Sequence, residues 1–198
     1  MKTAILALFT ACALLSPACA ATPAPEAAPL APGSTLDRSL DGAPKTVTDT
    51  KIASFKAEFR HEGGYMIRKG DKWEPDREKN ARRPHGFYRF TAVRESRGAK
   101  IAAEFPGDEK YEFTAPLSAL DELHTALIAN DLPQINGFDR WNSALGVYFW
   151  VSVRYSSGEK IEAYGEGGAA CSSPVDLGFL IDTFRALAEK YAPLANLN

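Results

Sequence analysis

Apolar and polar side chains alternate along much of residues 51–115. In "ASFKAEF", residues 53–59, the alanines and phenylalanines share one parity, while Ser54, Lys56 and Glu58 take the other. A period of two predicts a strand with one buried face. Related patterns predict strands at 61–70, 87–93, 99–105 and 110–115, with a turn or bulge at Gly63–Gly64 and a long polar loop at 70–86.

Two later segments change to a helical period. In residues 116–130 the apolar side chains recur every three or four positions, with Thr114 as the expected cap and Asn130 as the stop. The second helix is expected over 173–193, with Ser173 at the cap, Pro174 in the first turn and a stripe of Leu177, Leu180, Ile181, Phe184, Leu187 and Tyr191.

Residues 147–155, "VYFWVSVRY", predict the most apolar strand, and "SSGE" turns it into a second arm at 160–165. Tyr148 and Trp150 make its second face apolar at one end, which favours a central position in a sheet. The segment between the first helix and this strand has no clear period. The element order predicts an α+β fold: an antiparallel sheet of about seven strands with two helices on one face.

The N-terminus has the order of an export signal. Lys2 precedes the apolar run 4–15, and "ACA" at 18–20 offers a small-residue cleavage site after Ala20. The run is too short to span a bilayer. An alternative is a bacterial lipoprotein cut before Cys19, which would then carry a lipid. We therefore expect a periplasmic or secreted protein or, alternatively, an outer-membrane lipoprotein.

Residues 21–50 contain five prolines and six alanines and no aromatic residue. Such a composition buries too little surface to offset the entropy of ordering. The expected organisation is therefore a signal peptide at 1–20, a disordered tether at 21–50 and a single α+β domain at 51–193.

Charge is distributed unevenly along the chain. Residues 60–100 hold twelve Lys or Arg against six acids, whereas 101–198 hold six against fourteen. Either the two parts neutralise each other in the fold, which we favour, or the basic segment forms a face for an anionic partner. No nucleic-acid partner is expected, and contact with a membrane is expected only through a lipid on Cys19.

The stretch "AYGEGGAACSSPVD", residues 163–176, invites comparison with phosphate-binding loops. It lacks the lysine of a P-loop and the glycine spacing of a dinucleotide site, so it is interpreted as a turn whose glycines adopt positive φ. Cys171 near a helix start is a possible nucleophile with a histidine, although a small lone cysteine more often packs as a hydrophobe. Three scattered histidines give no zinc pattern. We expect no metal, no cofactor and no catalytic residue.

The C-terminal half resembles a poorly characterised set of small exported bacterial domains, many of them lipoproteins. The likeness runs over about 117–190 and consists of Gly137-Phe138-Asp139, a hairpin glycine at Gly158, Ala163 with Gly165, and Pro174. The sequence departs from it at "SALG", where Asp-Gly is expected, and at "GGAACS", which is longer. The resemblance implies an envelope location and a non-catalytic domain, and it implies no substrate.

The expected function is therefore that of an envelope binding domain whose partner is an envelope component or a secreted protein. The expected contact residues are Tyr148 and Trp150 on the uncovered sheet face, with Arg82 and Arg83 of the basic loop. Two alternatives remain: an enzyme that uses Cys171 with a histidine, and an inhibitor of a secreted hydrolase that inserts loop 70–86 into its target.

Overall fold

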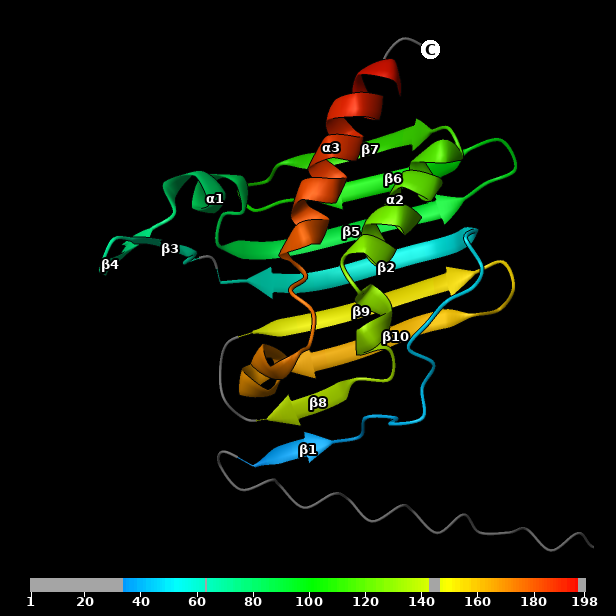
Figure 1. Cartoon of the computed structure of the whole chain (residues 1–198). Coiled ribbons are helices and arrows are strands. Elements are labelled where there is room, and N and C mark those ends of the chain that lie inside the picture. The colour runs from blue at the N-terminus through cyan, green and yellow to red at the C-terminus, as the bar shows by residue number, and fades with distance from the viewer. Residues whose placement is uncertain (1–33, 63, 143–146, 196–198) are drawn as a thin grey trace, which may run out of the picture.

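A broad sheet with two helices across one face forms the body of the molecule (Figure 1). The computed structural model describes residues 34–62, 64–142 and 147–195, without the side chains of 169–171 and 193–195. The strands of this sheet are β1 (Thr35–Asp37), β2 (Ile52–His61), β5 (Gly86–Arg94), β6 (Ala99–Glu104), β7 (Lys110–Ala115), β8 (Asp139–Asn142), β9 (Tyr148–Tyr155) and β10 (Lys160–Glu166).

The strand order is β1-β8-β10-β9-β2-β5-β6-β7, an eight-stranded sheet. Neighbouring strands are antiparallel except β8 and β10, which are parallel. The α+β class and the mostly antiparallel sheet are thus confirmed, while the strand count differs from the expected seven. Two of the observed strands, β1 and β8, were not expected. They are only three and four residues long and show no alternating pattern, and they are strands because they pair with their neighbours.

The core lies between the sheet and the helices α2 (Ser118–Ala129) and α3 (Gly178–Ala195), which lie over the same face (Figure 1). The stripe residues Leu120, Leu123 and Leu127 of α2 are fully buried, as are Leu180, Ile181 and Phe184 of α3. Phe184 stacks on Phe90 of β5 with ring centroids 4.4 Å apart, and it contacts Phe55 of β2 at 5.4 Å. The predicted helical stripes therefore do face the sheet.

The helix starts differ from the expected ones. Leu117 precedes α2 without any side-chain cap, and Thr114 belongs to β7. Before α3, the Ser173 hydroxyl accepts from the Val175 amide (3.3 Å), and the Asp176 carboxylate accepts from the Gly178 amide (2.8 Å). Each side chain closes a two-residue turn, so the helix does not begin at the expected cap Ser173, and α3 starts at Gly178.

The predicted turn after β10 is a short 3-10 helix, η2 (Gly167–Ser172). Gly167 has φ +66, the positive value expected where the chain leaves the sheet. Gly165 lies against Phe149, since a Cβ there would come within 2.4 Å of the Phe149 ring. These glycines therefore serve backbone geometry and close packing.

The segment 34–50, expected to belong to the tether, is hydrogen-bonded to the domain. β1 pairs with β8, and Val47 packs against the core. The amides of Thr48 and Asp49 both donate to the Glu159 carboxylate, at 2.9 and 2.8 Å. The packed chain thus begins well before residue 51. The expected signal peptide, Cys19 and residues 21–33 of the tether lie outside the described residues.

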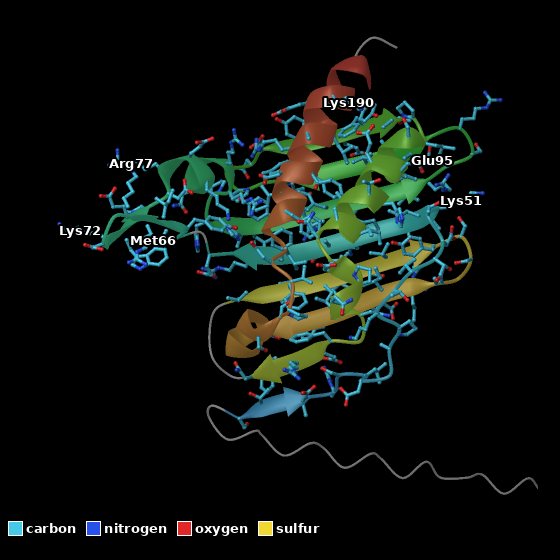
Figure 2. All side chains as sticks on the ribbon, viewed as in Figure 1. Lys51, Met66, Lys72, Arg77, Glu95 and Lys190 are labelled. Atoms are coloured by element: carbon cyan, nitrogen blue, oxygen red, sulfur yellow. The ribbon has the colours of Figure 1, made fainter. Side chains whose placement is uncertain are left out.

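The expected polar loop 70–86 contains regular structure. β3 (Met66–Lys69) and β4 (Lys72–Pro75) form a separate hairpin, followed by α1 (Arg77–Arg82). Figure 2 shows the hairpin and α1, with Met66, Lys72 and Arg77, projecting beyond the end of the sheet. Asn80 binds the base of the hairpin, donating to the Tyr65 carbonyl and accepting from the Tyr65 amide, both at 2.9 Å. Hydrogen bonds from side chains such as Asn80 therefore order this segment, and a run of polar residues does not reveal them in the sequence.

In the stretches that the structure describes, no helix combines the length and apolar character needed to cross a membrane.

Candidate functional site

The sheet face opposite α2 and α3, here called the open face, carries four neighbouring aromatic side chains. Tyr148 and Trp150 reach it from β9, because their odd-numbered neighbours Phe149 and Val151 face the core. Phe87 of β5 and Tyr164 of β10 complete the group, called the aromatic cluster below.

The rings of the aromatic cluster contact one another across the strands. Tyr148 lies 6.2 Å from Phe87, nearly parallel to it, and 5.9 Å from Tyr164, edge to face. Trp150 pairs with Tyr164 in the β9–β10 register. Burial and a hydrogen bond to the Glu166 carboxylate raise the pKa of Tyr164 to about 12, so its phenol stays protonated at neutral pH. The cluster thus offers a continuous apolar strip with hydroxyl groups in it.

A groove of about 730 Å³ adjoins the cluster at Trp150 and Tyr164. Its volume lies in the range of ligand sites. One side comes from the sheet and the other from segment 38–47, and the lining side chains include Arg38, Leu40, Thr46, Phe138, Asp139, Lys160 and Glu162. The groove therefore exists only because the segment once expected to be a tether lies along the sheet.

Gly137 lets that segment approach the sheet. Its φ is +77, and a Cβ there would come within 2.6 Å of the Ala43 side chain and 2.8 Å of the Leu40 carbonyl. The Leu40 amide donates to the Gly137 carbonyl, and the Gly137 amide donates to the Glu162 carbonyl, each at 2.8 Å. Glycine is thus required both by conformation and by space.

Buried and charged side chains hold the segment in place. Asn136, 6% exposed, donates to the Pro44 carbonyl and accepts from the Glu162 amide, both at 2.9 Å. At the other end, hydrogen bonds from the Thr48 and then the Asp49 amides lower the pKa of Glu159. Hydrogen bonds from the Lys51 and Ser157 amides likewise lower the pKa of Asp49. The wall of the groove is therefore preorganised.

The charges on the open face are paired. Every lysine and arginine that the strands β2, β5, β6, β7, β9 and β10 direct to this face lies 2.5–3.7 Å from a carboxylate oxygen; they are Lys56, Arg60, Arg89, Lys100, Lys110, Arg154 and Lys160. Lys56 also lies over the Trp150 ring, 4.6 Å from its centroid. The face therefore presents little net charge beside its aromatic side chains.

The structure does not bring Arg82 and Arg83 together with Tyr148 and Trp150. Arg83 is only 13% exposed and contacts the region where α3 begins, through Asp176 and Asp182, while it donates to the Tyr65 hydroxyl at 3.1 Å. Burial opposes its charge, but the hydrogen bonds from Arg83 to Asp182 and Tyr65 outweigh this and raise its pKa. Arg82, 70% exposed, pairs with Glu78 on the surface of α1. Arg83 thus fastens α1 to α3.

The histidines expected to serve Cys171 lie in three different settings. His124 of α2 contacts the Tyr155 hydroxyl at 3.4 Å, and His85 lies beside Glu62 at the surface. His61 lines a smaller pocket of about 310 Å³ with Ser173 and Asp176, and burial lowers its pKa. Cys171 belongs to η2, but its side chain lies outside the described residues. No cysteine–histidine pair is therefore assigned.

Among residues 34–62, 64–142 and 147–195, no group of three or more His, Cys, Asp or Glu side chains is placed to hold a metal ion. Comparisons with protein-family models, with curated proteins and with solved structures found no match to this chain.

Sequence reasoning identified two members of the cluster and missed Phe87 and Tyr164. Both had a usable signal: Phe87 alternates with buried Tyr88, and Tyr164 alternates with buried Ala163. The missing information was which strands are neighbours, since β10 lies beside β9, whereas β5 is separated from β9 by β2.

Proposed function

We propose that this protein is an exported bacterial envelope protein whose domain binds a ligand on its open face and performs no catalysis. The envelope location is supported by the leader-like N-terminus and by the resemblance of residues 117–190 to small exported domains. The binding role is supported by the open face.

One observation carries the binding role: a groove of about 730 Å³ adjoins, at Trp150 and Tyr164, a cluster of four solvent-accessible aromatic side chains on a face that neither α2 nor α3 covers. Exposed aromatic groups beside a preformed hollow are typical of recognition sites, where tyrosine and tryptophan supply much contact area. Folding alone does not require this arrangement, because the same strands already bury their other face under the helices.

The binding role is tested with envelope fractions of the producing bacterium. Wall, membrane and soluble periplasmic fractions are passed over immobilised wild type, Tyr148→Ala/Trp150→Ala, Arg82→Ala and Val93→Ala proteins. Val93, 46% exposed on the open face of β5, serves as the matched control. We expect one component to bind wild type and both single variants but not the double variant. Equal binding by the double variant would reject the open face as the contact surface.

The location is tested by the intact mass of protein recovered from that bacterium. A chain beginning at Ala21 supports a periplasmic or secreted protein, and a mass that includes a diacylglycerol on Cys19 supports the outer-membrane lipoprotein. An unprocessed chain retained in the cytoplasm would contradict export.

A second candidate, inhibition of a secreted hydrolase, is favoured by the projecting hairpin. Trp73 is 65% exposed, and all residues of β3 and β4 are exposed, while Asn80 and Arg83 are hydrogen-bonded to Tyr65 at the base of the hairpin. Rigid exposed loops suit insertion into an active site. The test replaces residues 66–75 by a glycine linker and measures residual activity of a panel of secreted hydrolases; unchanged inhibition, or none by wild type, rejects this role.

A further inference from the structure

The groove beside Trp150 and Tyr164 combines apolar rings with charged groups that are already paired. From this combination we propose that the ligand is an uncharged, extended polysaccharide. Its sugar rings would pack on the two aromatic side chains, and its hydroxyl groups would bind the polar rim. The inference rests on the proposed binding role of the open face and specifies the ligand class.

The charge of the rim argues for a neutral ligand. Arg38 pairs with Asp139 at 3.0 Å, while Lys160 and Arg154 share Glu162 at 2.6 and 3.0 Å. Glu159 is occupied by the backbone amides of segment 48–49. Two bases, Arg38 and Lys160, and three acids line the groove, and Arg154 pairs with Glu162 from outside it. A charged ligand would therefore have to break existing ion pairs, and an anion would also meet an excess of acids. An anionic polymer gains most where cations are free, which is not the case here.

The hydrogen-bonding capacity of the rim suits hydroxyl groups. A carboxylate has about four acceptor positions, and an ion pair uses only some of them. Asp139 and Glu162 therefore retain acceptor positions directly beside the donors Arg38 and Lys160. A hydroxyl group donates and accepts at once, so it fits between such a paired acid and base without adding charge.

The backbone of the groove argues against an added peptide strand. Extended peptides bind sheets mainly through free backbone groups at an edge. Along the groove, the Gly137 amide already donates to Glu162, and its carbonyl accepts from the Leu40 amide. The Tyr164 amide likewise donates to the Phe138 carbonyl at 2.8 Å. A ligand in the groove must therefore be recognised by side chains. A sugar suits such a site, because its C–H faces are apolar and its edges are polar.

The aromatic cluster continues beyond the groove, which points to a chain of sugars. From Tyr164 the contacts pass to Tyr148 at 5.9 Å and on to Phe87 at 6.2 Å, spanning β10, β9, β2 and β5. A single sugar ring in the groove would leave these rings unused. An extended polymer that leaves the groove along the open face contacts all of them.

The experiment measures retention on uncharged polysaccharides, namely cellulose, chitin, a soluble β-glucan and dextran, with heparin as the polyanion. The proteins are wild type, Trp150→Ala, Tyr164→Ala and the same-face control Val93→Ala, each first shown by circular dichroism to be folded. We expect wild type and Val93→Ala to bind at least one uncharged polymer equally, and both aromatic variants to bind at least about tenfold more weakly. Retention should change little between about 0.05 and about 0.5 M salt, because no net charge is involved.

Three results would overturn the inference: no retention on any uncharged polymer, retention that the aromatic variants do not change, or retention on heparin alone that salt abolishes. The envelope-fraction test separates this inference from the proposed function. If binding that the Tyr148→Ala/Trp150→Ala variant loses is found there to a protein but to no polysaccharide, the binding role stands and the polysaccharide falls. If the double variant binds like wild type to the envelope fractions and Trp150→Ala binds like wild type to the polysaccharides, both fall.

Discussion

Both faces of the sheet carry aromatic side chains, but those on the covered face form the core and those on the open face reach solvent. On β9, Phe149 is 3% exposed and packs against Phe138, whereas its neighbours Tyr148 and Trp150 are only partly buried on the open face. The covered face is continuous hydrocarbon from β10 to β7, while the open face intersperses its aromatic cluster with ion pairs. One residue along the strand separates a side chain that stabilises the fold from one that is free to contact a ligand.

The difference has a physical basis in what surrounds each ring. On the covered face, helices exclude water, so each buried ring contributes transfer energy and close contacts. On the open face the charged groups pair with one another at the surface, and the partly buried rings contribute less to stability than the rings of the core do.

The largest change in stability is expected when Phe149 and Trp150, two adjacent residues of β9, are each replaced by alanine. Phe149→Ala should lower the free energy of unfolding by about 3–5 kcal/mol, because it leaves a cavity against Phe138 and Gly165. Trp150→Ala should lower it by only about 1–2 kcal/mol, since the ring is partly buried and borders solvent. Urea denaturation measures both values. Equal losses would mean that the open face is part of the core.

A smaller effect is expected at the wall of the groove. Gly137→Ala should cost about 2 kcal/mol, because the new Cβ meets Ala43 and Leu40 in a left-handed conformation. The change should also displace segment 40–43 and weaken binding at the groove. Denaturation and the polysaccharide assay measure the two consequences. A variant of unchanged stability and binding would show that the segment does not lie where we describe it.

The arginines give the next smaller contrast. Arg83→Ala should cost about 1–2 kcal/mol, because it removes hydrogen bonds to Asp182 and Tyr65 from a side chain only 13% exposed. Arg82→Ala should cost less than about 0.5 kcal/mol, since its pair with Glu78 is a surface i,i+4 pair. Thermal denaturation compares them directly. A larger loss of stability in Arg82→Ala than in Arg83→Ala would mean that Arg83 lies at the surface and not against α3.

The smallest effect is expected from acid. The pKa values of Glu159 and Asp49 are lowered by backbone hydrogen bonds, so folding favours their charged forms. Their contribution is present above the ordinary carboxyl pKa near about 4 and is lost as the pH falls through the lowered values. Amide exchange, corrected for intrinsic rates, should show lower protection at Thr48 and Asp49 below about pH 4, while Ala57 in the covered core keeps its protection. Parallel loss at all three would indicate global unfolding.

Local pattern was sufficient for the covered face. Alternation in 53–59 placed Phe55 and Phe59 on one side, and the structure buries both. The helical period likewise placed Leu123 and Phe184 against the sheet. These features are predictable because burial on one face imposes a period on the residues of a single element, which a sequence displays directly.

The candidate site was only half predictable. Tyr148 and Trp150 follow from the parity of one strand, but their union with Tyr164 and Phe87 depends on strand order. The basic residues Arg82 and Arg83 were grouped with them because they stand in a polar segment of the sequence, and only tertiary contacts direct Arg83 to α3.

What the sequence by itself determined is the α+β class, most of the long strands, the two amphipathic helices and the parity of β9, because each depends on residues close in the chain. Only the tertiary structure decided that β8 lies parallel to β10, that segment 38–47 forms a wall of the groove, and that 66–82 fold into a hairpin and a helix. These depend on single contacts between distant residues, such as Asn136 with Pro44 and Asn80 with Tyr65. A polar side chain satisfied by a remote backbone group leaves no period in the sequence, so no local pattern announces it.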